Sequence, residues 1–209
     1  MRNWITALVM IFMFMSNGYS AGKPGQFGLA ASLFQGGGTE IALSRVATPS
    51  TMYLLHTRIN YTTSSSESES QTSAGSTSAE GPTDNRLGIS LIPEYRRYRT
   101  PAKRISSYWG IYALVGYMTD KSETPGTTSV ETIDTDFSVG GGLSFGVEYF
   151  LNSFFSISAH TRLLQYTFVS SKTETTTSSG STSVTNSTTM TSNNFMLTVQ
   201  PFLYLRFYW

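Results

Sequence analysis

The chain consists mainly of short segments in which apolar and hydrogen-bonding residues alternate. Residues 194–209 show this pattern well. Leu203 and Phe207 fall on one side of an extended chain, whereas Tyr204 and Arg206 fall on the other. A repeat of two residues is the period of a β-strand, because successive side chains of a strand point to opposite faces. The pattern predicts an all-β protein whose strands each have one apolar and one polar face.

The alternating segments predict eight strands, at residues 26–34, 39–46, 51–61, 86–98, 105–118, 137–150, 154–169 and 194–209. Short turns such as Thr48-Pro-Ser50 and Asn152-Ser153 separate some neighbouring strands. Long connections separate others, so that short and long connections alternate, with Gly36-Gly-Gly38 as an exception. We expect antiparallel neighbours with one set of connections at each end of the sheet.

The three long connections, residues 62–84, 119–136 and 170–194, are rich in Ser, Thr, Glu and Gly. Segments of this composition bury too little apolar surface to balance the entropy that is lost on ordering. They are predicted to be mobile loops.

Charged residues decide which face of the strands points inward. Arg58, Arg86 and Arg162 all lie on the polar faces, together with Glu94 and Glu148. An arginine that faces lipid at the middle of a membrane costs roughly 2–4 kcal/mol. The polar faces are therefore predicted to line an interior, and the apolar faces to meet lipid.

These features together predict an eight-stranded antiparallel up-and-down transmembrane β-barrel of the bacterial outer-membrane type, with short turns in the periplasm and long loops outside. Pro93 and Pro201 lie within strands, where each removes one ladder hydrogen bond. Both are expected near the periplasmic ends and on the outer face. The alternative is a soluble, lipocalin-like periplasmic barrel, which would bury Trp109 and Phe145.

Residues 1–21 have the layout of a secretory signal peptide: a basic start, an apolar run from Trp4 to Met15, and small residues before Ala21. The apolar run is shorter than the ~20 residues that a spanning helix needs. Residues 22–209 are predicted to form one barrel domain. The chain has no cysteine, which excludes disulfides and thiolate metal sites, and its net charge of +1 gives no indication of nucleic-acid binding.

The chain resembles the small eight-stranded outer-membrane barrels typified by OmpX and the membrane domain of OmpA. Residues 87–98, 138–149 and 203–209 carry the resemblance. The closing strand, with Tyr204, Phe207 and Trp209, resembles the signal that the barrel-assembly machinery reads, although Phe is the more usual last residue. The resemblance implies an architecture and a bacterial outer-membrane location rather than a particular activity.

The predicted lumen contains a set of charged residues: Arg58, Arg86, Glu94, Arg96, Glu148, Arg162 and Arg206. Eight strands enclose a space that side chains just fill, so we interpret this set as a structural charge network. The alternative is a channel lined by charges. His56 and His160 also point inward, but the polar lumen lacks the apolar slot of the barrels that act as lipid acyltransferases. We therefore predict no catalytic residues, no cofactor and no metal.

The sequence thus predicts a small outer-membrane barrel with a structural or surface-exposed role, whose Ser/Thr-rich loops form a contact or shielding surface. The alternative function is a narrow, porin-like pore or a lipid-modifying enzyme. Expected partners are outer-membrane lipid, the barrel-assembly machinery and extracellular contacts through the loops. Basic residues around one periplasmic turn, among them Arg97, Arg99 and Arg104, are suited to phospholipid headgroups, and the alternative is a solvated turn that blunts the strand ends.

Overall fold

The computed structural model describes residues 23–34, 39–72, 75–99, 104–125 and 128–209, with the side chains of 34, 39, 66–81 and 198–200 left out. Every regular element among them is a strand, and the predicted all-β class is confirmed. The strands are β1 (Phe27–Phe34), β2 (Thr39–Thr48), β3 (Thr51–Thr72), β4 (Gly75–Tyr98), β5 (Ile105–Thr124), β6 (Thr128–Phe150), β7 (Phe155–Ser179) and β8 (Thr182–Tyr208). The predicted signal peptide, residues 1–21, lies outside the described residues.

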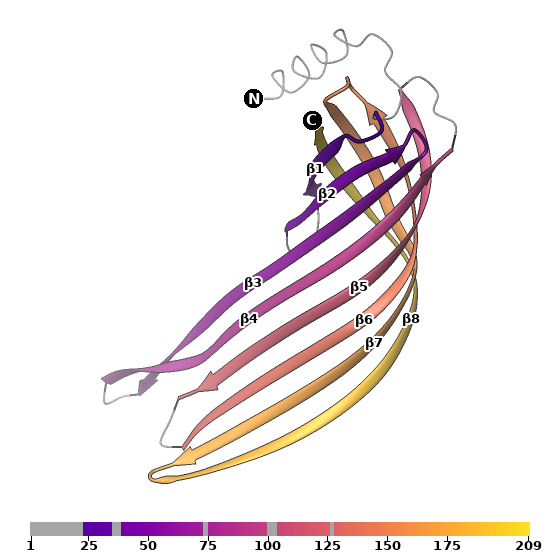
Figure 1. Cartoon of the computed structure of the whole chain (residues 1–209). Coiled ribbons are helices and arrows are strands. Elements are labelled where there is room, and N and C mark those ends of the chain that lie inside the picture. The colour runs from indigo at the N-terminus through magenta and orange to yellow at the C-terminus, as the bar shows by residue number, and fades with distance from the viewer. Residues whose placement is uncertain (1–22, 35–38, 73–74, 100–103, 126–127) are drawn as a thin grey trace.

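Each strand pairs antiparallel with the next, and β1 also pairs with β8, so the sheet closes into a barrel. The two ends of this barrel differ (Figure 1). We call the end with the start of β1, the end of β8 and the short connections of β2–β3, β4–β5 and β6–β7 the turn end. The opposite end, where β3–β4, β5–β6 and β7–β8 join, is the hairpin end. The predicted up-and-down connectivity is confirmed.

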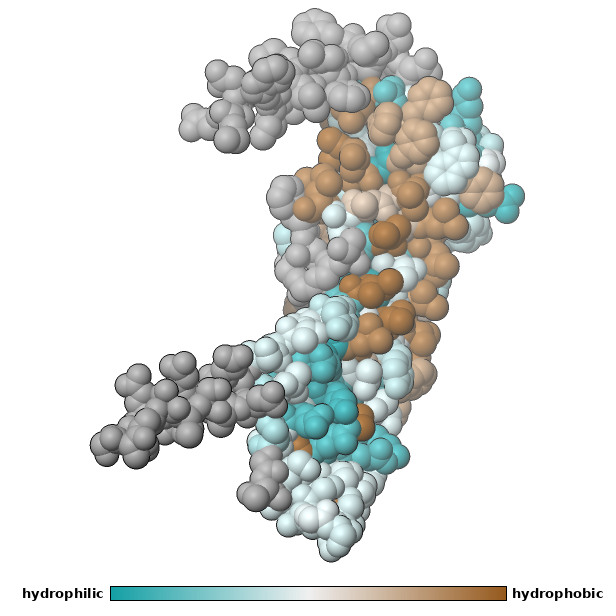
Figure 2. All heavy atoms as spheres, turned by 90° about the vertical axis from the view of Figure 1, so that its left-hand side faces the viewer, coloured by the Kyte–Doolittle hydropathy of each residue, from teal (hydrophilic) through white to brown (hydrophobic). Residues whose placement is uncertain are grey.

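The inward and outward faces follow the predicted parity. Outward-facing apolar side chains remain exposed, for example Leu29 at 48% and Ile111 at 52%, while inward-facing Glu148 and Arg206 are 0% exposed. Apolar residues cover the wall near the turn end, and polar residues cover the hairpin end (Figure 2). This distribution is the reverse of that in a soluble domain, because the ionic side chains are inside.

The long connections differ from the prediction. Residues 62–84, 119–136 and 170–194 were expected to be mobile loops, but most of them continue the flanking strands into long two-stranded hairpins. The entropy argument treats such segments as isolated chains, whereas here the barrel fixes the register from which pairing continues. Threonine also favours strands, because its branched Cβ suits an extended backbone. Gly180 turns the last hairpin with a φ of 59°, a conformation that favours glycine.

The first hairpin is much shorter than the others. β2 pairs with β3 only as far as Thr39 with Ile59, and β1 pairs with β8 only as far as Phe34 with Leu203. Beyond these pairs, β3 to β8 continue as a curved sheet (Figure 1). In the described residues β3 and β8 are its edges, and the edge of β8 extends from Thr182 to Leu197.

β7 contains an irregularity that reverses its alternation. Arg162 pairs with Ser144 of β6, and Leu164 pairs with the adjacent Leu143, so one additional residue of β7 sits between the two pairs. Up to Arg162 the even-numbered residues point inward. Beyond it Tyr166 is exposed on the outer wall, while the Tyr112 hydroxyl reaches the Gln165 side chain inside. A bulge of this kind keeps apolar residues outside where the sequence changes phase.

Pro93 and Pro201, the two prolines predicted to lie within strands, are exposed on the outer face, as predicted. Pro93 pairs with Leu55 of β3, where it needs no N–H. Pairing with β5 is interrupted beside it, between Leu91–Val115 and Glu94–Tyr112, without a change in register. The missing N–H donor of Pro93 therefore interrupts the hydrogen-bond ladder locally, but it does not end the strand.

Candidate functional site

The interior of the barrel near the turn end is an ionic core, built on three buried glutamates. Glu40 comes from β2, Glu94 from β4 and Glu148 from β6, and each is at most 4% exposed. A buried carboxylate is strongly destabilising unless cations and hydrogen-bond donors surround it. Each glutamate accordingly has a set of partners, most of them on other strands.

Glu40 is held by two arginines and a tyrosine. Its carboxylate lies 2.8 Å from Arg58 Nη2 and 2.8 Å from Arg162 Nη2, and it accepts a 2.6 Å hydrogen bond from the Tyr204 hydroxyl. Arg162 comes from β7 and Tyr204 from β8, so this cluster ties β2 to strands across the lumen. Charge-assisted bonds of this type are about twice as strong as neutral ones.

Glu94 is held on its own strand and by the opposite wall. Arg96 donates to both of its oxygens, from Nε at 2.9 Å and from Nη2 at 3.0 Å. Ser144 of β6 donates its hydroxyl at 2.5 Å. The paired donation fixes the plane of the carboxylate as well as its charge.

His56 connects these two clusters. Its Nδ1 lies 2.8 Å from Glu40 Oε1, and its Nε2 lies 2.7 Å from Glu94 Oε2. Of these two contacts, the one between Nε2 and Glu94 has the geometry of a hydrogen bond. His56 therefore bridges the two carboxylates, and it is 0% exposed.

Glu148 forms the layer nearest the turn end. Arg206 Nη1 lies 2.8 Å from its carboxylate, and the hydroxyls of Tyr98, Tyr208 and Ser156 donate to it at 2.5, 2.7 and 2.5 Å. All four partners come from strands other than β6.

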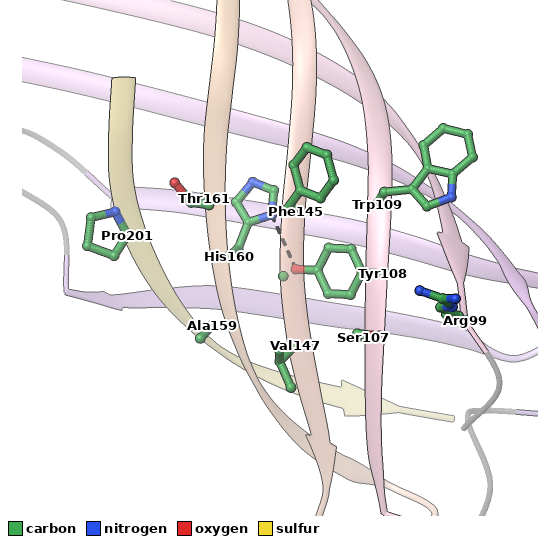
Figure 3. A pocket seen from close by; sticks show the side chains of 11 residues that line it. Arg99, Ser107, Tyr108, Trp109, Phe145, Val147, Ala159, His160, Thr161 and Pro201 are labelled. Carbon is green, nitrogen blue, oxygen red and sulfur yellow. Dashed lines mark hydrogen bonds between the residues drawn. The ribbon is translucent and has the colours of Figure 1, made fainter. Parts of the chain in front are cut away.

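Aromatic rings fill the space between the charged layers. The Arg96 guanidinium lies 4.4 Å from the centre of the Tyr108 ring, and that of Arg162 lies 5.0 Å from Phe202. The Tyr108 hydroxyl lies 3.2 Å from His160 Nδ1 (Figure 3). Gly146 permits this arrangement, because a Cβ there would overlap the Tyr108 ring and the Ala159 carbonyl.

Cations outnumber anions in the core. Four arginines, Arg58, Arg96, Arg162 and Arg206, face three glutamates. Some donors are consequently without an acceptor among the described residues, including Arg96 Nη1 and Arg206 Nη2. The core thus has a positive electrostatic character although the whole chain is nearly neutral.

Arg86 lies apart from this core, and the expectation that it joins the lumen network is corrected here. Its side chain is exposed and donates to the Met118 sulfur at 2.9 Å. The reason is distance along the strand, since Arg86 lies about 34 Å from Arg96 at ordinary strand rise. Parity places both residues on the same face but does not place them at the same height.

Arg86 instead lines a polar hollow of about 360 Å³ on the concave face of the hairpin end. The hollow is lined by Thr62, Ser64, Asp84, Arg86, Asp120, Ser122, Thr132 and Asp134. Nearby on the outer face, Lys121 lies 2.7 Å from Glu131, and this hydrogen bond raises the pKa of Lys121. The hairpin end is a hydrated surface, unlike the packed core.

The closing residues of the chain divide between the two faces. Tyr204 points inward to Glu40, whereas Phe207 and Trp209 are exposed outside and stack at 6.0 Å. Their recognition by the barrel-assembly machinery stays a prediction. Tyr98, Tyr108 and Tyr208 were absent from the predicted network, although their even numbers place them on the inward face.

The part of the chain that the structure describes contains no helix long and apolar enough to cross a membrane. Within the same residues, no group of three His, Cys, Asp or Glu side chains is arranged to hold a metal.

Comparison with known proteins gives little beyond the fold. No family model matches the sequence, and no curated protein matches it. Among solved structures, the chain is similar to the crystal structure of Acinetobacter baumannii CarO, with a TM-score of 0.36 and 10% sequence identity. The match covers 89% of this chain and 97% of that one.

Proposed function

We propose that this protein is a small bacterial outer-membrane β-barrel with a sealed bore, which holds three long polar hairpins at the cell surface. The observation that carries the proposal is the inverted distribution of side chains. Leu29, Ile111 and other large apolar residues are exposed on the outer wall, while charged Glu148 and Arg206 are fully buried. Hydrocarbon around the wall is the solvent that this distribution suits.

The sealed bore is supported by the ionic core. Three layers, centred on Glu40, Glu94 and Glu148, span the lumen through direct side-chain contacts. An ion that crosses the barrel would have to break several charge-assisted hydrogen bonds at each layer. We therefore favour a structural role for the lumen over the porin-like alternative.

A role at the cell surface is supported by the hairpins. They extend the sheet well beyond the closed barrel, and their composition suits water (Figures 1 and 2). Because strand pairing orders the hairpins, they would present a defined surface rather than a set of mobile loops. We propose that this surface carries the extracellular contacts or the shielding role, without catalysis.

The orientation follows from charge. Apart from the three core glutamates, all acidic residues lie between Glu67 and Asp136 or at Glu174, in the hairpin segments. Described basic residues at the turn end are Lys23, Arg45, Arg97, Arg99 and Arg104. Arginine is favoured beside anionic phospholipid headgroups, so we place the turn end at the periplasmic leaflet and the hairpins outside.

Two measurements test the proposal. The protein should be recovered in the outer-membrane fraction and should migrate differently on gels before and after boiling, as closed barrels do. Refolded protein in planar bilayers should produce no discrete conductance steps. Recovery in the soluble periplasmic fraction would refute the membrane barrel, and steady single-channel steps that change in Arg162→Ala would favour the pore.

A further inference from the structure

The outer wall of the barrel contains a hollow of about 570 Å³ near the turn end (Figure 3). It extends over β5, β6, β7 and β8, and its lining residues include Trp109, Phe145, Ala159 and Pro201. These side chains point outward and are exposed. The hollow therefore opens toward the surroundings of the barrel, and inward-facing Tyr108, Gly146 and His160 also border it.

The hollow arises where small residues adjoin large ones on the outward face. One cross-strand row contains Trp109, Phe145, Thr161 and Pro201. The adjacent row, nearer the turn end, contains Ser107, Val147 and Ala159. Ser107 and Ala159 leave a depression beside the two large aromatic rings.

The hollow extends along the barrel wall from the turn end. Arg99, the residue after β4, lies at its turn-end border, and Pro201 lies on β8, four strand spacings along the barrel wall, or roughly 19 Å. Pro201 is about 27 Å along β8 from Trp209, which is about 20 Å along the barrel axis at a tilt of about 40°. The hollow thus rises diagonally from the membrane interface toward the middle of a hydrocarbon core of about 30 Å.

The turn-end border of the hollow is strongly basic. Arg97 pairs with Trp109 in the first row, and the backbone N–H of Arg99 donates to the Ser107 carbonyl. Both side chains are exposed, and Arg104 lies at the far side of the same connection. In the described residues no acidic side chain lies on the outer face at this end, and none forms an ion pair with Arg97, Arg99 or Arg104.

We propose that this hollow binds one anionic phospholipid of the periplasmic leaflet, with an acyl chain along Ser107, Val147 and Ala159 and the headgroup phosphate on Arg99 and Arg97. This inference rests on the proposed membrane location. Hydrocarbon must fill an apolar hollow that faces lipid, and a guanidinium forms paired, charge-assisted hydrogen bonds with phosphate. At this position an apolar hollow on the outer wall adjoins two exposed arginines.

Trp109 provides a reporter inside the site. The full chain has three tryptophans, and a Trp4→Phe, Trp209→Phe background leaves only Trp109 to fluoresce. Refolded protein in zwitterionic micelles would be titrated with phosphatidylglycerol or phosphatidylcholine that carry the same brominated acyl chains. Bromine quenches tryptophan on contact, so we expect quenching at lower concentrations of phosphatidylglycerol.

Two variants and two matched controls decide the outcome. Arg99→Ala should weaken apparent phosphatidylglycerol affinity about fivefold and leave phosphatidylcholine unchanged, because one arginine near an anionic headgroup contributes about a factor of five. Ala159→Phe should fill the hollow and reduce quenching by both lipids. Arg45→Ala, an exposed arginine at the same end, and Ala113→Phe, an outward alanine on β5 outside the hollow, should behave like the parent.

Equal affinity for the two lipids in the parent would overturn the lipid site, as would an Arg99→Ala result no different from Arg45→Ala. Each sample must first show the heat-dependent gel shift of a folded barrel. A chain that fails this step or does not enter micelles contradicts the proposed membrane barrel itself. The two failures are therefore distinguishable.

Discussion

At the scale of single residues, His56 has the most demanding position in the molecule. It is fully buried and lies within 2.8 Å of carboxylates on two different strands. Without this imidazole, Glu40 and Glu94 would face each other across the core with no side chain bridging them. The fold thus depends on the His56 side chain. The alternation of the strand places this side chain inside, but no local sequence motif identifies its role.

Replacing His56 with alanine should reduce the free energy of unfolding by about 3–5 kcal/mol, because it leaves two buried carboxylates with one partner fewer. Urea titration of refolded protein, followed by the heat-dependent gel shift, would measure this change. Arg86→Ala is the control, since Arg86 is exposed and away from the core. Equal stability of the two variants would contradict the assigned role of His56.

A second prediction concerns Gly146, where a Cβ would overlap the Tyr108 ring and the Ala159 carbonyl. Gly146→Ala should destabilise the barrel by about 1–3 kcal/mol, the usual cost of overpacking. Gly88→Ala is the matched comparison, because the nearest atom to a Cβ at this inward glycine is 3.7 Å away. The same urea titration applies, and a larger loss at Gly88 would show that the packing is described incorrectly.

At the scale of elements, the closed half of the barrel could be predicted from the alternating pattern, and the hairpin half could not. The turn-end boundaries of the strands agree closely with the prediction, because prolines, an Asn-Ser pair and charged turns mark them. At the other end the pattern fades into Ser and Thr, whose β-propensity acts only when a neighbouring strand is already in register. A glycine near the centre of each segment, Gly75, Gly126 and Gly180, was the available signal of a hairpin turn.

The candidate site was predictable only in part, for a related reason. Parity gives the face of each residue, and so it identified Arg162 and Glu94 as inward. The partners depend on the stagger between strands, which no single strand encodes. Arg162 and Glu40, 122 residues apart, meet across the lumen only because the closed barrel fixes that stagger. The doublet Leu163-Leu164 was the one visible indication that the alternation of β7 changes phase.

Shortening the last hairpin tests whether the barrel folds without it. Deleting Thr173–Thr188 and joining Lys172 to Thr189 through an Asn-Gly turn retains the register below the cut, where these two residues already pair. We expect the gel shift to persist and the free energy of unfolding to change by about 1 kcal/mol or less, since the removed residues are polar and border no part of the ionic core. Loss of the folded band would show that the hairpin is needed for barrel closure.

At the scale of the whole molecule, the separation of charge assigns the two ends to two environments. The acidic hairpins suit water, and the basic turns suit anionic headgroups. The absence of cysteine from the sequence makes this orientation easy to test. In whole cells, a membrane-impermeant maleimide should label Thr188→Cys at once and should label Ser50→Cys only after the outer membrane is broken. Labelling in the opposite order would reverse the proposed orientation.

The uneven lengths of the hairpins have a consequence for handling the protein. From Thr182 to Leu197 the exposed edge of β8 contains no charged residue, proline or glycine. Natural sheets use such residues to prevent unwanted strand addition. Another extended chain can pair with an edge of this kind, so the protein should self-associate in concentrated preparations. Thr188→Lys would place a gatekeeper charge on it, and light scattering at rising concentration should then show less association than in the parent.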